Sequence, residues 1–431
     1  MEVFSIAILL FSFLLLLSIG TPVAWSIIIS SLFTLLVSVP FLPALTTISQ
    51  RMATGIDSFA LLAIPFFILS GELMNKGGVA HRLVAFAKAL VGFLPGGLAL
   101  INVISAMLMG SVAGSAMASA SAMGSILGPE MEKEGYSKGF GVAINITSAT
   151  TGLVIPPSNI LIVYSLASGG ASIAALFLAG YIPGILTGLF LMAVAMIWAK
   201  KKNFKTGKRA PLKTVFGSFV RAFPSLMLLF VVIGGIVSGV FTATEASAIA
   251  VIYTLVLGFV YKEITFKTLP TILLKSSTTT AIVMFLIGAS MSMSWVLSYE
   301  NIPEMISSGI LSLSDNKIVI LLLINFTLLF VGIFMDMTPA VLIFTPIFLP
   351  IVTQLGIDPV HFGIIMILNL CIGLCTPPVG SVLFVGVGVA NTSIQKVIKP
   401  LIPLFLAMIV ALLLVTYIPA LSLWLPSIFD L

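Results

Sequence analysis

The sequence Gly-Leu-Val-Ile-Pro-Pro-Ser-Asn at residues 152–159 decides how this chain can fold. A second segment, Gly-Leu-Cys-Thr-Pro-Pro-Val-Gly at residues 373–380, repeats its Gly-Leu-x-x-Pro-Pro pattern 221 residues later. Each segment falls midway along an apolar stretch. Paired prolines interrupt a helix because they remove two backbone donors and clash with the preceding turn. The two segments therefore predict two interrupted helices at matching positions of the two halves.

The composition places these helices in a lipid bilayer. Hydrophobic residues make up 59% of the 431 residues and charged residues only 8%, whereas a soluble domain carries about 25% charged residues. At about 20 residues for each crossing, the chain can hold roughly 10 to 14 crossings. We therefore expect an all-α polytopic membrane protein. The carbonyls freed at a break cannot face lipid, so each break must line a cavity, unless it is a simple structural kink. Matched breaks of this kind indicate a transporter binding site.

A distinctive stretch precedes each break. Residues 109–122 are almost entirely Gly, Ala, Ser and Met. They predict the turn of a re-entrant hairpin, or alternatively a small-residue packing face. The matching stretch contains Asp336 inside an apolar run. A carboxylate at that depth costs several kcal/mol unless it is paired, so it either lies hydrated near the outer interface or binds a cation. Sites rich in oxygen and free of imidazole suit hard cations, and we expect sodium.

The basic residues predict the orientation. Seven of them lie at 200–213, among them Lys205 and Lys208, and this loop is expected in the cytoplasm. Of the 20 basic residues, 18 then fall on or near that side, and only Arg51 and Lys317 lie outside. If the stretches at 96–131 and 318–352 each enter and leave by the same face, both termini lie outside and each half makes five net crossings. Because five is an odd number, the halves are then expected to be inverted repeats. The expected bounds are 1–199 for the first repeat (hairpin about 96–131, broken helix about 139–167), 200–215 for the loop, and 216–431 for the second repeat (hairpin about 318–352, broken helix about 360–390).

Several classes of protein are disfavoured. The sequence has no P-loop pattern, no metal-ligand spacing and no evident cofactor site, and Cys371 and Cys375 are expected to be small apolar packers. We therefore expect no enzyme, no cofactor and no nucleic-acid partner, with transport driven by an ion gradient or by another subunit. A channel and an intramembrane enzyme are the rival classes. The small-residue turns disfavour an open pore, and no catalytic constellation supports an enzyme.

These motifs resemble those of the large membrane subunit, DctM type, of TRAP (tripartite ATP-independent periplasmic) transporters. The resemblance covers essentially the whole chain. It rests on the twin breaks, on Gly-Ser-x-x-Gly-Ser-Ala at 110–116 and on Ile-Pro-Phe-Phe-Ile-Leu-Ser-Gly at 64–71. It implies sodium-driven import of an organic acid across the bacterial inner membrane by an elevator movement. The sequence looks most like the sialic acid members, and C4-dicarboxylate members share the motifs. The implied partners are a small four-helix membrane subunit and a periplasmic binding protein. The alternative is a stand-alone sodium-coupled carboxylate carrier of the same fold.

The resemblance also implies site residues. A first sodium site would lie where the hairpin turn at Ser111, Gly114 and Ser115 meets the break at Gly152, Val154 and Pro156. A second would lie where Asp336 and Thr338 meet Gly373, Cys375, Thr376 and Pro377. The substrate would lie between them, near Ser115, Thr151, Ser158 and Asn159. Neither turn nor break contains Lys or Arg. The anion is therefore expected to be held by sodium, helix N-termini and neutral donors.

Overall fold

A computed structural model describes residues 2–202, 204, 207, 209–313 and 316–431 of the chain. Lys205 and Lys208 of the predicted basic loop lie outside the described residues. The described part is helical and has no strand. Eight of its helical segments are long and apolar enough to cross a membrane, and four shorter helices are apolar as well. The prediction of an all-α polytopic membrane protein is confirmed at this level.

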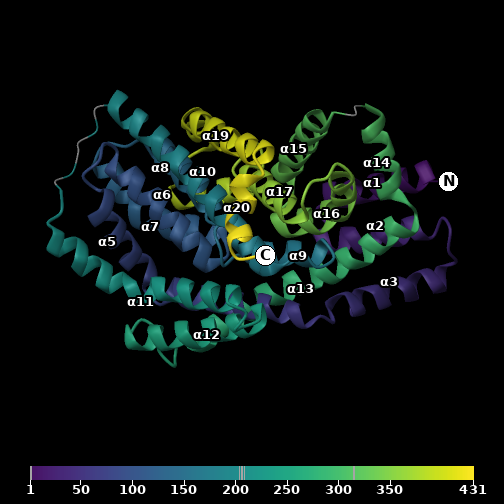
Figure 1. Cartoon of the computed structure of the whole chain (residues 1–431), viewed down its shortest axis with the longest axis horizontal. Helices are drawn as coiled ribbons and strands as arrows, with labels where there is room; N and C mark the ends of the chain where they lie inside the picture. Colours follow the sequence, from purple (N-terminus) through teal and green to yellow (C-terminus); the bar gives the residue numbers. More distant parts are fainter. Residues whose placement is uncertain (1, 203, 205–206, 208, 314–315) are drawn as a thin grey trace.

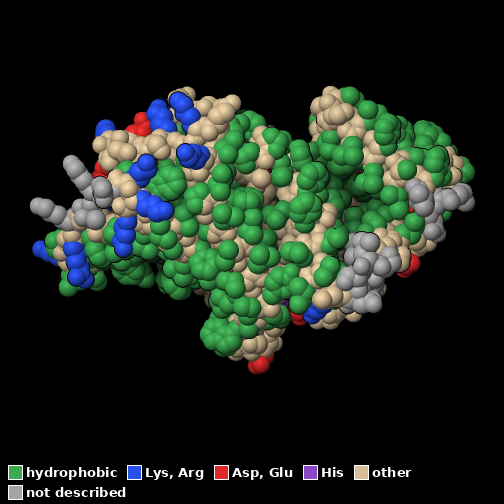
Figure 2. Space-filling view, turned by 90° about the horizontal axis from the view of Figure 1, so that it is seen from above, with side chains coloured by type: hydrophobic (Ala, Val, Ile, Leu, Met, Phe, Trp, Pro, Cys, Tyr) green, Lys and Arg blue, Asp and Glu red, His purple; other side chains and the backbone are tan. Residues whose placement is uncertain are grey.

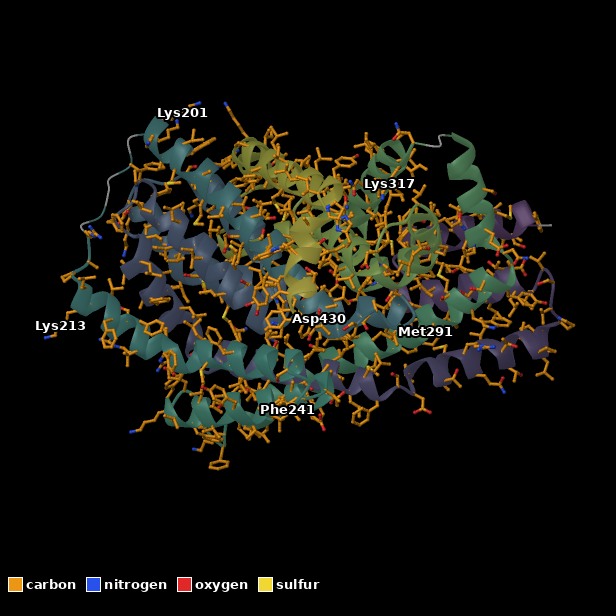
Figure 3. The ribbon with its side chains drawn as sticks, in the orientation of Figure 1. Lys201, Lys213, Phe241, Met291, Lys317 and Asp430 are labelled. Atoms are coloured by element: carbon orange, nitrogen blue, oxygen red, sulfur yellow. The ribbon has the colours of Figure 1, made fainter. Side chains whose placement is uncertain are left out.

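The surface agrees with a lipid environment. Phe11, Phe230 and Phe326 each leave 70–71% of their surface exposed, and hydrophobic side chains cover most of the face in Figure 2. Such large apolar patches are rare on soluble monomers. Lys and Arg gather at one end of the same face (Figure 2). Lys201 and Lys213, two bases of the predicted basic loop, lie at that end, whereas Lys317 lies far from them (Figure 3).

The helices before the first hairpin form an outer group. Helix α3 packs along α13 and α2 (Figure 1), and its Gly55 lies against Met291 of α13. Helix α4 packs on α12 and α13. The bounds are α1 Glu2–Ser18, α2 Val23–Leu35, α3 Phe41–Ile56, the short 3-10 helix η1 Phe59–Leu62, α4 Ala63–Lys76 and α5 Val79–Val91.

A helix pair and an interrupted helix follow. Helices α6 and α7 meet at residues 114–115, and α8 and α9 are separated by residues 152–158, where the first Pro-Pro pair lies. The peptide bond between Pro156 and Pro157 is cis. The bounds are α6 Gly97–Ala113, α7 Ala116–Lys133, α8 Lys138–Thr151, α9 Asn159–Ala167 and α10 Ile173–Lys201.

The second half of the chain also has a helix pair followed by an interrupted helix. Helices α15 and α16 meet at residues 335–336, and α17 and α18 are separated by residues 374–380. The bond between Pro377 and Pro378 is also cis. The bounds are α11 Leu212–Val237, α12 Ala243–Val260, α13 Leu269–Tyr299, α14 Ile302–Leu313, α15 Lys317–Phe334, α16 Met337–Gln354, α17 Pro359–Gly373, α18 Ser381–Val389, α19 Ile394–Tyr417 and α20 Ala420–Ile428.

Helices α6–α10 of the first half and α15–α19 of the second half pack on each other reciprocally. Helix α7 packs on α18 while α16 packs on α9, and α8 packs on α19 while α17 packs on α10. In Figure 1, α6–α8 and α15–α17 lie on the two sides of α10, α19 and α20. Buried side chains from both sets belong to one hydrophobic core. Neither set is therefore an independent packing unit.

Glycine pairs set the distance between each hairpin and the broken helix beside it. A Cβ on Gly152 would lie 2.8 Å from the Gly110 Cα, and a Cβ on Gly373 would lie 2.5 Å from the Gly332 Cα and carbonyl carbon. Real Cβ atoms do not approach backbone atoms this closely. Both contacts therefore require glycine, and they occur at matching places of the two halves.

Hydrogen bonds occur at matching places too. The one hydroxyl proton of Ser148 in α8 is within reach of the Asn102 Oδ1 of α6, at an O···O distance of 3.2 Å, and of the Ile144 carbonyl of its own helix. In the other half, Asn369 of α17 donates to the Asn325 Oδ1 of α15 at 2.8 Å, and Asn369 lies 221 positions after Ser148. All five residues are buried. Because buried polar groups are costly without partners, each bond favours one register of hairpin against broken helix.

Replacing Gly373 with alanine tests the close contact. The new methyl group would meet the Gly332 backbone, which cannot rotate away, and overpacking of this kind costs about 1–3 kcal/mol. We expect Gly373→Ala to lower the midpoint of thermal unfolding of the detergent-purified protein. The matched control is Gly388→Ala in α18, where an added Cβ meets nothing within 4 Å. Equal midpoints for the two variants would contradict the prediction.

Candidate functional site

Both helix turns and both breaks contribute to one cavity of about 460 Å³. The turns contribute Gly114, Ser115, Asp336 and Thr338, and the flanks of the breaks contribute Leu153, Asn159 and Leu374. The rest of the lining includes residues of α4 and α13. The cavity volume fits a small organic molecule.

The first turn is shaped by glycine and capped by serine. Gly114 has a φ of +60°, a left-handed conformation that glycine adopts at no steric cost. Ser115 caps α7 by accepting a hydrogen bond from the Ala118 N–H at 3.3 Å. A Cβ on Gly114 would lie 2.7 Å from the Asn159 Nδ2. The amide of Asn159, the first residue of α9, therefore lies directly against the turn.

The second turn places a carboxylate in the cavity wall. Asp336 is the N-cap residue of α16, but its side chain makes no cap hydrogen bond. The Gly380 N–H donates to the Ile333 carbonyl at 3.1 Å, which ties the second break to the hairpin helix α15. The carboxylate of Asp336 thus lies at the N-terminus of α16, which is the positive end of the helix dipole.

The residues predicted for the first sodium site divide into two groups. Gly114 and Ser115 line the cavity. Ser111, Gly152, Val154 and Pro156 are buried behind it. The Ser111 hydroxyl donates to the Leu108 carbonyl at 2.9 Å, and a Cβ on Gly180 of α10 would lie 2.2 Å from the Val154 oxygen. In this conformation the Val154 carbonyl therefore faces α10.

The residues predicted for the second sodium site divide in the same way. Asp336 and Thr338 line the cavity, whereas Gly373 and Cys375 are buried and Thr376 and Pro377 are half-buried. The Cys375 sulfur lies 3.2 Å from the Thr150 hydroxyl of α8, and the Thr376 hydroxyl donates to the Ile372 carbonyl at 2.7 Å. The Cys375 side chain thus packs between the two broken helices.

The residues predicted for the substrate are only partly brought together. Ser115 and Asn159 line the cavity. Thr151 and Ser158 are buried, and their hydroxyls donate to the Thr147 and Leu153 carbonyls of their own segment. In this conformation their hydroxyl protons are used in hydrogen bonds to backbone carbonyls near the break.

An ion pair in the cavity wall was missed by the sequence analysis. The Lys275 ammonium of α13 lies 2.8 Å and 2.9 Å from the two carboxylate oxygens of Glu72 of α4. The sequence predicts Lys275 on or near the cytoplasmic side, and it predicts sodium, helix N-termini and neutral donors around the anion. The turns and breaks do lack Lys and Arg, but α13 brings a base to the cavity. One signal in the sequence was available, because Lys275 opens a run of six polar residues inside an apolar segment.

Comparison with known proteins identifies the family. The sequence profile described as "Tripartite ATP-independent periplasmic transporter, DctM component" matches residues 10–421. The chain is 56% identical to YgiK of Salmonella typhimurium over 99% of this chain and 98% of that protein. It is 41% identical to the C4-dicarboxylate TRAP transporter large permease protein DctM of Pseudomonas aeruginosa over 86% and 87% of the two chains.

A sialic acid relative is similar at a comparable level. The sialic acid TRAP transporter large permease protein SiaM of Vibrio cholerae is 38% identical over 97% of this chain and 98% of that protein. The predicted resemblance to a large TRAP subunit is therefore confirmed, and the sialic acid kind is one of several kinds among the relatives. The relatives named as permeases are transporters, which also confirms that the chain is no enzyme.

The structure has the fold of known transporters. It matches the crystal structure of the YdaH transporter of Alcanivorax borkumensis with a TM-score of 0.64 and 14% identity, over 91% of this chain and 90% of that one. The similarity shows a shared membrane-transporter fold, and the more similar sequences and the family profile show the family. The chain belongs to the DctM family, the large permease subunits of the tripartite ATP-independent periplasmic transporters, and is a multi-pass membrane protein of that bacterial transporter family.

Proposed function

We propose that this chain is the membrane permease that imports a small organic acid across the bacterial inner membrane in symport with sodium. One observation carries the proposal: both hairpin turns and both helix breaks meet at one cavity large enough for such a molecule. Breaks in matching segments of two repeats mark the substrate and ion sites of secondary transporters. The permeases named for C4-dicarboxylates and sialic acid support an organic acid as substrate.

The charge of the cavity supplies a physical reason for coupling to sodium. Among the described residues that line it, the charged ones are Glu72, Lys275 and Asp336. Lys275 is paired with Glu72, so an ionised Asp336 leaves the lining with a net negative charge. This charge opposes the entry of an organic anion. Bound sodium would neutralise it, and a second sodium would make the cavity attractive to an anion.

The proposed movement is of the elevator type, with the two halves as inverted repeats. Reciprocal packing of α7 on α18 and of α16 on α9 supports a single body that carries both turns and both breaks. The cavity lies between that body and residues of α4 and α13. Movement of the body past α4 and α13 would expose the cavity to one side of the membrane and then to the other.

The proposed partners are a small four-helix membrane subunit and a periplasmic binding protein that delivers the acid. Uptake into proteoliposomes that contain the chain and its small subunit tests the whole proposal. We expect uptake of labelled sialic acid or of labelled succinate, a C4-dicarboxylate, only when an inward sodium gradient and the matching binding protein are both present. Uptake that needs sodium but no binding protein would instead show a stand-alone carrier. Uptake that ignores sodium would reject symport.

Replacing Asp336 with asparagine tests the sodium site. The amide keeps the shape of the side chain but removes the charge, and a contact to a charged group contributes about 1.5–3 kcal/mol. We expect Asp336→Asn to raise the sodium concentration for half-maximal uptake at least about tenfold, with an unchanged thermal midpoint. Asp57→Asn is the matched control, because the exposed Asp57 does not line the cavity. Normal uptake with normal sodium dependence in Asp336→Asn would remove this residue from the site.

The proposed orientation places both termini in the periplasm and the loop between α10 and α11 in the cytoplasm. The basic end in Figures 2 and 3 supports this orientation through the positive-inside rule. Alkaline phosphatase is active only in the periplasm, and green fluorescent protein fluoresces only in the cytoplasm. We expect phosphatase activity from a fusion after Leu431 and fluorescence from an insertion in the loop at residues 202–211. The same reporter working at both places would contradict inverted halves.

A further inference from the structure

The ion pair in the cavity wall is unequally exposed. The Lys275 side chain leaves 56% of its surface accessible, whereas the Glu72 side chain leaves 15%. The ammonium is therefore the accessible member of the pair, and both residues line the cavity.

The ammonium retains hydrogen-bonding capacity. A lysine ammonium carries three N–H donors and no acceptor, and the two Glu72 oxygens at 2.8 Å and 2.9 Å account for two of them. A third donor remains for a group inside the cavity. Glu72 holds the amine in place, so little side-chain freedom would be lost when a ligand binds.

The surroundings favour an anion as that ligand. Among the described residues lining the cavity, Lys275 is the one base. The same side of the cavity carries apolar side chains from Ile64, Ile68 and Val283. A charge contact against such a surface is less screened than one in open water. A small organic anion with an apolar carbon skeleton matches this combination.

We propose that Lys275 is the cationic contact for the transported organic anion and that Glu72 is its counter-ion while the cavity is empty. The inference rests on the proposed function and extends it by naming the group that binds the anionic end of the substrate. On binding, the ammonium bridges Glu72 and the carboxylate of the substrate. When the anion leaves, Glu72 is again the partner of the Lys275 ammonium, so release leaves no unpaired cation in the cavity wall.

A cysteine at position 275 provides a sharp test. The native cysteines, Cys371 and Cys375, are buried at 1% and 0% exposure, so a reagent in the aqueous phase would label the new thiol selectively. We expect Lys275→Cys to reduce uptake of the acid that the wild type carries at least about tenfold. An aminoethyl methanethiosulfonate reagent, which restores a positive charge, should recover uptake. A sulfonatoethyl reagent, which adds a negative charge, should not.

Labelling gives a second readout that needs no transport. Sodium and the transported acid together should slow labelling of the cysteine severalfold, because the anion would cover the thiol or its surroundings. Lys267→Cys is the matched control: it removes an exposed base eight positions earlier that does not line the cavity. Lys267→Cys should keep wild-type uptake, and the labelling rate of its cysteine should be the same with and without the substrate. The proposal would be overturned if both reagents restored uptake equally. It would also be overturned if the substrate did not change the labelling rate of the cysteine at position 275.

Exchanging the two charges distinguishes a role of Lys275 in substrate binding from a role in joining α4 to α13. The double variant Glu72→Lys with Lys275→Glu keeps an ion pair between α4 and α13 but moves the cation to the less exposed position. A purely structural pair predicts normal uptake in this variant, and that result would overturn the inference. Substrate contact predicts that uptake stays at least about tenfold below wild type while the thermal midpoint recovers. If the wild type itself imported no organic acid, the proposed function would fail as well, whereas wild-type uptake with unaffected variants would refute only the role of Lys275.

Discussion

The structure depends on one constraint: backbone groups freed by a helix break have no water to bind within a bilayer. The chain places two such breaks, at residues 152–158 and 374–380, inside the packed helices. The first is buried along most of its length, and the second is tied to the neighbouring hairpin by the bond from Gly380 to Ile333. Each break therefore lies beside a hairpin helix of its own half, and the two sets pack on each other as well.

Close approach makes this packing possible. The Gly110–Gly152 and Gly332–Gly373 contacts bring each hairpin helix against the helix that ends at the break. The Asn102–Ser148 and Asn325–Asn369 hydrogen bonds fix the register nearby. In each half, the glycine contact and the polar contact favour the same position of the hairpin against the broken helix. In these positions both turns line the same cavity. A larger residue at any of these glycines would move a turn away from the cavity.

The cavity joins two kinds of surface. One comes from the turns and breaks and carries Asp336. The other comes from α4 and α13 and carries the paired charges of Glu72 and Lys275. The proposed mechanism assigns them separate tasks, with a cation near Asp336 and an anion near Lys275. Placing the two charges on different helix groups would let ion and substrate depend on each other without direct competition for one residue.

The sequence by itself determined the membrane class, the helical content, the two breaks and the family, because composition, paired prolines and local motifs act over short stretches of chain. It singled out Asp336 and Ser115, which line the cavity. It did not show that the Cys375 side chain packs against Thr150, that the Thr151 hydroxyl bonds its own helix, or that Lys275 meets Glu72 across 203 positions. Only the tertiary structure decided these points, since the side-chain contacts of a helix depend on which neighbours pack around it, and hydrophobic periodicity does not specify those neighbours.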